Sequence, residues 1–162
     1  MTRDQFKALF DLNFEAVRNY IYYRSGDAEL AADLAQDTFL KIWEKRSEPG
    51  DRNLRGLLFK IAGDEFISHV RKQKSLSRFR LQFRPGLLDV SPEEQVMFEE
   101  MKERYELALA RMPEKQRTVF LMSRLDRMKY HEIAERLDLT VKAVEKRMNL
   151  ALSLLKDELK VI

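Results

Sequence analysis

Apolar residues recur at steps of three and four through the N-terminal part of the chain, a spacing typical of amphipathic helices. We expect a first helix that ends near Arg24, followed by a break at Ser25-Gly26-Asp27. Asp27 is placed to cap a second helix, because its carboxylate can accept hydrogen bonds from the first free N–H groups. The inward residues of the first helix are Phe6, Phe10, Phe14, Val17 and Ile21.

The same spacing predicts a second helix that runs to about Lys45 and a third that spans Leu54 to about Lys72. The turn residues Glu48-Pro49-Gly50-Asp51 separate them. The three helices form a first predicted domain, residues 1–74. The inward residues of the second helix are Leu30, Leu34, Ala35, Phe39, Ile42 and Trp43, and those of the third are Leu57, Leu58, Ile61, Ala62 and Phe66.

Residues 75–92 lose the helical period and are predicted to form a flexible basic linker between two domains. Within them Phe79, Leu81 and Phe83 alternate with basic or polar residues. This period of two fits a strand, a membrane-surface patch or an extended segment in a partner's groove. We favour the extended segment, because a lone strand has nothing to pair with.

Helical spacing resumes after Ser91-Pro92, residues typical of a helix start, in a second predicted domain, residues 93–162. We expect Pro113 to end the first helix of this domain and another helix to run from Glu114 to about Leu125. The predicted buried stripe before Pro113 is Met97, Met101, Tyr105, Ala108 and Met112.

Tyr130 to Ala151 has the pattern of a helix-turn-helix, in which two helices cross through a turn of three or four residues. Ala134 is small where the second helix crosses. Asp138 stands in the turn, where it tolerates a positive φ, and Thr140 can cap the second helix. A stripe of apolar residues then points back at the first helix: Val144, Met148, Ala151, Leu155 and Leu159.

The other face of this second helix carries side chains that can reach phosphates or base edges in the major groove. An ordinary helical hairpin with a solvated face would look similar. We favour DNA binding, because several independent positions agree within one short segment. With the capping Thr140, the candidates are Lys142, Glu145, Lys146, Arg147 and Asn149.

Composition agrees with an all-α fold of two small helical domains. Five Gly and four Pro interrupt 162 residues, of which 44% are hydrophobic and 35% are charged. The net charge is +3, but the basic segment Arg71–Arg84 contains no acid and directly precedes the acidic segment Glu93–Glu106. The pattern indicates a polyanion site beside a partner-facing surface, although a charge run alone is more typical of a solvated face.

The residue inventory argues against an enzyme. There is no cysteine, and the two histidines, His69 and His131, are expected in surface or packing roles. Without a Gly-rich phosphate loop or a nucleophile–base pair, we expect no catalytic residue, metal, cofactor or small-molecule substrate. The N-terminus lacks an apolar signal sequence, and no apolar stretch approaches the roughly 20 residues of a membrane span, so we expect a cytoplasmic protein.

The segment Asp33-Leu-Ala-Gln-Asp-Thr-Phe-Leu-Lys-Ile-Trp43 carries apolar residues on one helix face and polar ones on the other. The polar residues, suited to docking on a basic partner, are Asp33, Gln36, Asp37 and Lys41. This segment resembles the polymerase-binding helix of bacterial sigma factors, in the small extracytoplasmic-function (ECF) group of the sigma-70 family. The C-terminal motifs of the resemblance are Arg111-Met-Pro-Glu-Lys-Gln-Arg-Thr-Val-Phe120, Tyr130-His-Glu-Ile-Ala134 and Val144-Glu-Lys-Arg147.

The resemblance covers nearly the whole chain and implies a mechanism. The polar residues of the second helix would bind the β′ clamp helices of core RNA polymerase, with the β flap as a further contact. Phe6–Lys74 would open the minus-ten promoter element, and Leu107–Leu159 would read the minus-thirty-five element. A membrane-bound anti-sigma factor would hold the protein inactive. The minus-ten candidates are Lys60, Asp64, Ser68, Arg71 and Lys72, and those for minus-thirty-five are the helix-turn-helix residues named above.

Two positions depart from the family's pattern. Ile-Ala is usually followed by a basic residue and Asn, with Asp four residues after that Asn, whereas this chain has Ile61-Ala-Gly-Asp-Glu-Phe-Ile-Ser68. Asp64 thus replaces an amide, which can donate and accept hydrogen bonds, with a group that only accepts them, and it adds negative charge where DNA should come. Ala143 stands where Thr or Ser is common, which removes a phosphate contact.

The leading hypothesis is therefore an alternative sigma factor that directs core RNA polymerase to a set of promoters. One alternative is a stand-alone helix-turn-helix regulator, which dimerisation and a palindromic site would favour. The other is a polymerase-binding adaptor that does not melt promoters, for which Asp64 and Ser68 are the best argument.

Overall fold

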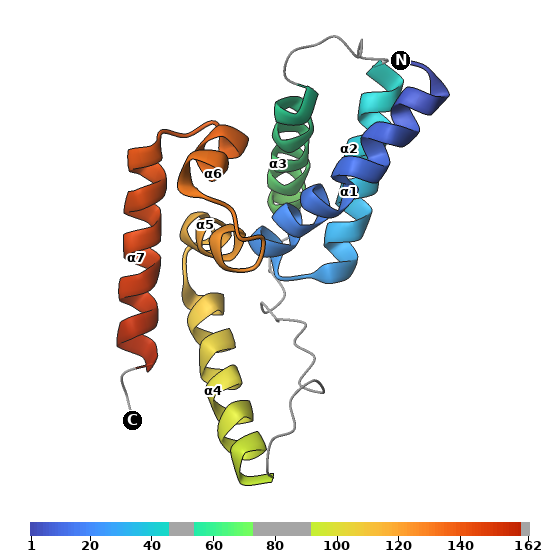
Figure 1. Ribbon diagram of the computed structural model, residues 1–162. Coiled ribbons are helices and arrows are strands. Elements are labelled where there is room, and N and C mark those ends of the chain that lie inside the picture. The colour runs from blue at the N-terminus through green and yellow to red at the C-terminus, as the bar shows by residue number, and fades with distance from the viewer. Residues whose placement is uncertain (46–53, 73–91, 160–162) are drawn as a thin grey trace.

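The computed structural model describes residues 1–45, 54–72 and 92–159, and these ranges contain seven helices and no strand. The all-α prediction is confirmed. Helices α1 to α3 form one group and α4 to α7 another, and the two groups lie against each other (Figure 1). The expected linker, with its alternating Phe79 to Phe83 segment, lies outside the described residues except for Pro92, which begins α4.

The N-terminal domain consists of α1 (Arg3–Ser25), α2 (Ala28–Lys45) and α3 (Leu54–Lys72). The turn between α1 and α2 forms as predicted. Gly26 ends α1 in the left-handed conformation, with φ of 70°, and the Asp27 carboxylate accepts a hydrogen bond of 3.1 Å from the Leu30 N–H. The cap and the glycine together reverse the chain, so that α2 returns along α1.

Aromatic side chains of α1 pack around Phe39 of α2, which is 1% exposed. The ring centroids of Phe10 and Phe39 lie 5.0 Å apart in an edge-to-face arrangement, and those of Phe6 and Phe39 lie 6.5 Å apart. Such pairs add about 0.5–1.5 kcal/mol to the gain from burial alone. The inward residues that the periodicity predicts for these helices are buried or half-buried, which confirms the assigned faces.

The C-terminal domain consists of α4 (Pro92–Arg111), α5 (Glu114–Arg124), α6 (Tyr130–Leu137) and α7 (Val141–Leu159). The last two helices form the predicted helix-turn-helix. Asp138 occupies the left-handed region with φ of 54°, and the Thr140 hydroxyl accepts a hydrogen bond of 3.1 Å from the Ala143 N–H. The predicted inward residues Val144 and Met148 are buried against α5 and α6.

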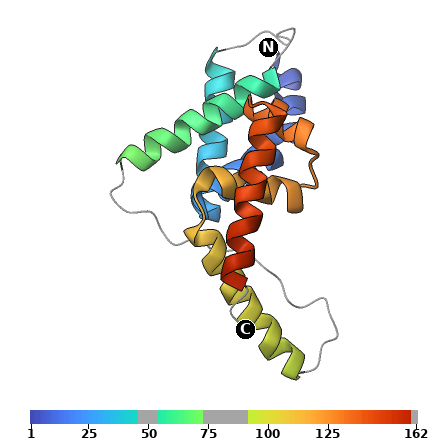
Figure 2. The ribbon, with the colours of Figure 1, turned by 90° about the vertical axis from the view of Figure 1, so that its left-hand side faces the viewer.

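The predicted buried stripe of α4 is wrong in its first half. Ala108 and Met112 are buried, but Met97 is 65% exposed and Met101 is 54% exposed. The first part of α4 extends past the end of α7 and away from the other helices (Figure 2). Helical spacing predicts which face of a helix is apolar, but a residue on that face is buried only where another helix packs beside it.

None of the described helices is both long enough and apolar enough to cross a membrane.

We expect the backbone at Asp138 to make that position sensitive to side-chain shape. A β-branched residue is strained in the left-handed region, where ordinary residues already lose about 1–2 kcal/mol. Asp138→Val should lower the free energy of unfolding by at least about that amount, whereas Asp138→Gly should leave it unchanged or raise it. Urea denaturation followed by circular dichroism measures both. Asp157→Val, within the helical part of α7, is the control, and equal effects at the two positions would contradict the strain argument.

Candidate nucleic-acid interface

The first turns of α7 present the predicted duplex-reading residues. Lys142, Glu145, Lys146 and Asn149 are exposed, as is the capping Thr140. These residues project from a helix whose opposite side is anchored in the domain core. The position of this face suits a helix that enters a major groove.

Arg147 differs from the other residues of this face, because it is half-buried and lies toward the N-terminal domain. Burial raises the pKa of the Tyr20 hydroxyl on α1, and the positive charges of Arg24 and Arg147 oppose that rise. The charge of Arg147 therefore acts across the boundary between the domains. Arg147 is therefore less exposed to solvent than Lys146.

The predicted minus-ten residues lie along α3 and are all exposed: Lys60, Asp64, Ser68, Arg71 and Lys72. The last four line a depression of about 540 Å³ together with Ile67. Lys60 and Asp64 also line a cleft of about 620 Å³ whose opposite wall is α6. The structure thus gathers these residues on one side of α3, and part of that side faces the other domain.

The predicted polymerase-binding residues Asp33, Gln36, Asp37 and Lys41 are exposed on α2. The ammonium group of Lys41 forms an ion pair with Glu65 of α3, a residue that the sequence did not single out. Leu40, 53% exposed, lies between Asp37 and Lys41 in sequence and adds an apolar contact to this surface. The face therefore combines carboxylates with an apolar side chain, a composition suited to a protein partner.

Helix α1 packs against α5, and α3 packs against α6, so the two domains share an interface. Across this interface the Arg24 guanidinium donates two hydrogen bonds to the Glu114 carboxylate, of 2.7 Å from Nε and 2.8 Å from Nη2. The same guanidinium lies 4.5 Å from the ring centroid of Phe66 and donates a hydrogen bond of 3.1 Å to the Tyr20 hydroxyl. The side chain of Arg24 is 12% exposed.

Arg117 of α5 joins the C-terminal ends of two helices. Its Nε donates a hydrogen bond of 2.8 Å to the Tyr23 carbonyl, and its Nη2 donates one to the Arg24 carbonyl, both at the end of α1. Its Nη1 donates to the carbonyls of Leu109 and Met112 at the end of α4. A buried cation thus satisfies carbonyl groups that a helix end leaves without partners.

Tyr23 extends the same interface to the loop after α5. Its hydroxyl donates a hydrogen bond of 2.5 Å to the Asp126 carboxylate. Burial, and then the neighbouring Asp126, raise the pKa of Tyr23 well above its ordinary range. Burial also raises the pKa of Asp126, and the hydrogen bond from Tyr23 works against that rise.

The second part of the interface, between α3 and α6, is more open. The Arg136 guanidinium lies 4.9 Å from the ring centroid of Phe59, and its Nη1 donates a hydrogen bond to the Met128 sulfur. Glu135 and Asp138 line the cleft opposite Lys60 and Asp64. Carboxylates therefore stand on both walls of this cleft.

Family models match both groups of helices. Residues 9–76 match the family model described as Sigma-70 region 2, and residues 102–155 match the one described as Sigma-70, region 4. The chain belongs to the sigma-70 family. Sigma factors are transcription initiation factors and not enzymes, and the two matched regions correspond to the two helical domains seen here.

Several curated sigma factors are similar to this one over most of their length. It is 27% identical over 137 residues to the RNA polymerase sigma factor YlaC of Bacillus subtilis, covering 82% of this chain and 79% of the relative. It is 24% identical over 172 residues to the ECF sigma factor SigW of the same organism, covering 98% and 90%. These similarities place it with the ECF sigma factors.

The fold is similar to that of a solved sigma factor, RpoE in complex with the anti-sigma factor NepR from Bartonella quintana. The TM-score is 0.68, the sequence identity is 26%, and the similarity covers 99% of both chains. The similarity therefore extends over both groups of helices.

We expect this sigma factor to lose stability at alkaline pH through Tyr23. In the unfolded chain a tyrosine ionises near pH 10, whereas the raised pKa keeps Tyr23 protonated in the folded protein. The unfolded state then binds fewer protons, so the free energy of unfolding should fall as the pH rises above about 10. Tyr23→Phe should make this fall shallower in urea unfolding measured over a pH series. Tyr130→Phe is the control, and an identical slope for wild type and Tyr23→Phe would contradict the assignment.

Proposed function

We propose that this sigma factor binds core RNA polymerase through the exposed polar face of α2 and directs it to promoters through α3 and α7. The observation that carries the proposal is that the candidate residues of α3 and most of those of α7 are exposed on two helices, while α2 exposes a third set of polar residues that includes two carboxylates. The residues of this third set, Asp33, Gln36, Asp37 and Lys41, are all exposed on α2. Their partner is the β′ clamp helices, with the β flap as a second polymerase contact.

The exposed side of α3 would meet the single strand of the opened minus-ten element. Arg71 and Lys72 supply charge for phosphates near the end of the helix, and Lys60 supplies it near the start. Asp64 lies between them on the same side. It would repel phosphate and favour a base edge that donates a hydrogen bond, so the promoter preference should differ from that of relatives with Asn.

The first turns of α7 would read the minus-thirty-five element as duplex. Lys142 and Lys146 would contact phosphates, and Asn149 and Glu145 can reach base edges. Each domain alone would bind DNA weakly. The two weak contacts become specific when polymerase holds both domains at the spacing of one promoter.

An anti-sigma factor is the expected inhibitor, because the similar sigma factor RpoE is bound by one. We place the protein in the cytoplasm with core polymerase and its inhibitor at the membrane. The second candidate function is an adaptor that binds polymerase without melting promoters, and the exposed Asp64 on the minus-ten side favours it. A run-off assay with core polymerase and genomic promoter fragments separates the two, since the adaptor would give no promoter-specific transcript.

We expect charge reversal at Asp37 to weaken binding to core polymerase by about tenfold or more, which corresponds to about 1.4 kcal/mol. Asp37→Lys should leave the helical content unchanged, because the side chain is exposed. Surface plasmon resonance with immobilised core enzyme measures the affinity. Asp11→Lys, on the exposed side of α1, is the control. Equal affinities of the two variants would count against α2 as the polymerase-binding face.

Removal of the two exposed lysines of α7 should weaken promoter binding by the holoenzyme and reduce its salt dependence. Each phosphate contact contributes about 0.9 to the slope of log affinity against log salt, so Lys142→Ala with Lys146→Ala should lower the slope by about two. Filter binding over a salt series measures it. Lys156→Ala, on the last turns of the same helix, should not change the slope. An unchanged slope for the double variant would exclude α7 as the duplex-reading helix.

A further inference from the structure

Arg24 lies where the interface between the domains meets the proposed strand-binding side of α3. The cleft between α3 and α6 is lined by Arg24 together with Lys60, Gly63 and Asp64. A Cβ atom at Gly63 would lie 3.3 Å from Arg24 Nη1, which shows how closely the guanidinium approaches the α3 backbone. Because Gly63 has no side chain, a cation from α1 is brought next to the side chains that face nucleic acid.

Several contacts of the Arg24 guanidinium come from its own domain. Phe66 of α3 lies beneath it at 4.5 Å, and the Tyr20 ring of α1 lies at 5.6 Å. The Tyr20 hydroxyl accepts a hydrogen bond from Nη1. These aromatic contacts remain if the C-terminal domain moves away, so the guanidinium stays in place without Glu114.

Glu114 is the contact that the C-terminal domain contributes. Its two carboxylate oxygens accept from Nε and Nη2 of Arg24, which is the paired geometry that a guanidinium offers equally to a phosphate. When the domains part, these two N–H groups lose their acceptor. They then lie in the same cleft as Lys60.

We infer that Arg24 is a nucleic-acid-binding residue of the N-terminal domain, and that Glu114 occupies its phosphate site while the two domains are packed together. The inference rests on the proposed function, in which a single strand of promoter DNA lies along α3. Parting of the domains exchanges the carboxylate for a backbone phosphate of single-stranded DNA.

The charges of the opposite wall explain why the exchange requires the domains to part. Glu135 of α6 and Asp138 of the turn after it line the cleft opposite Lys60 and are exposed. A strand lying along α3 in the packed arrangement would bring its phosphates toward these carboxylates, and like charges at short range repel. The carboxylates and the DNA therefore compete for the same side of α3.

The test measures binding of a fluorescein-labelled single-stranded DNA of about 15 nucleotides to the full chain by anisotropy over a salt series. Glu114→Gln should bind more tightly than wild type, because the competing carboxylate charge is gone. Glu114→Gln combined with Arg24→Gln should lose this gain, and its slope of log affinity against log salt should be smaller by about 0.7, the value for one phosphate contact on a single strand.

A purely structural role for Arg24 gives a different result. Both variants would then part the domains alike and bind the oligonucleotide with the same affinity and salt slope, which would overturn the inference. An affinity of Glu114→Gln no higher than that of wild type would overturn it as well, as would the absence of binding by all variants.

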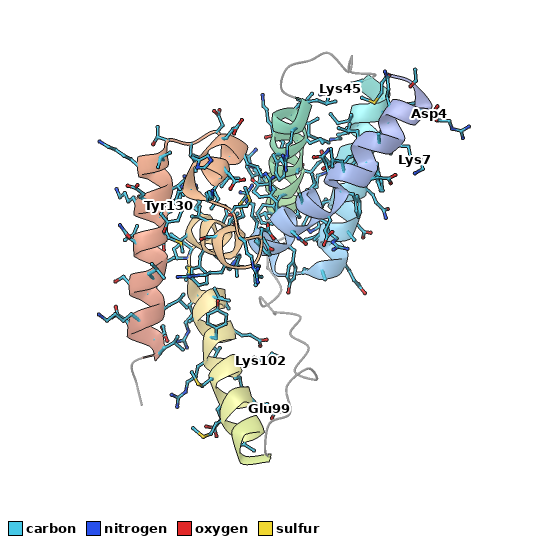
Figure 3. All side chains as sticks on the ribbon, in the orientation of Figure 1. Asp4, Lys7, Lys45, Glu99, Lys102 and Tyr130 are labelled. Atoms are coloured by element: carbon cyan, nitrogen blue, oxygen red, sulfur yellow. The ribbon has the colours of Figure 1, made fainter. Side chains whose placement is uncertain are left out.

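Two controls support the comparison. Lys7→Gln removes one positive charge near the other end of α1, far from the cleft, and should not reduce the slope (Figure 3). The chain has no cysteine, so dyes can be attached at Leu12→Cys and Leu150→Cys, both exposed in the wild type. Energy transfer between them should be equal in Glu114→Gln and the double variant, so that a difference in binding reflects the cation and not the domain separation.

The run-off assay keeps this inference separate from the proposed function. A missing transcript together with the predicted binding pattern would remove the sigma function and leave Arg24 as a nucleic-acid-binding residue. A promoter-specific transcript together with equal binding by the two variants would leave the function and remove the inference.

Discussion

The pair between Arg24 and Glu114 joins the last turn of α1 to the first residue of α5, and it determines how the two domains lie relative to each other. Around it, Arg117 satisfies the terminal carbonyls of α1 and α4, and Tyr23 reaches Asp126. Each of these contacts uses the end of a helix. The ends supply unpaired carbonyl groups and N–H groups, so charged side chains placed there gain directional hydrogen bonds as well as charge complementarity.

An ion pair of this kind fixes the geometry of the contact more than it adds to the free energy of unfolding. A buried ion pair roughly offsets its own desolvation, whereas removal of one partner leaves an uncompensated charge that typically costs about 3–5 kcal/mol. Glu114 is 34% exposed, so solvent reduces that cost on its side. Arg24, at 12%, depends more on its partner. A carboxylate or a phosphate can each accept the hydrogen bonds of this guanidinium. Arg24 can therefore be paired both when the domains are packed together and when they are apart.

Local sequence signals predicted the helices and the helix-turn-helix because each depends on neighbours within a few residues. Asp138 with its positive φ and Thr140 with its capping bond are examples. The buried face of α4 was predicted too far toward its start, since burial of Met97 and Met101 depends on where α7 ends. The domain contact was not predicted at all. Arg24 and Glu114 are 90 positions apart, and no periodicity links them, although Glu114 and Arg117 lie within the motif that carried the resemblance.

Asp64, which stands where the family usually has Asn, lies on the more weakly held side of the domain interface. On the α1–α5 side, a paired guanidinium and a buried arginine hold the domains tightly. On the α3–α6 side, Asp64 faces Glu135 and Asp138 across an open cleft, with the Arg136 contact to Phe59 as the main attraction described there. An amide at position 64 would remove one of these like charges. The aspartate therefore adds like-charge repulsion across the α3–α6 side of the contact, and this repulsion favours opening of the cleft through which DNA would reach α3.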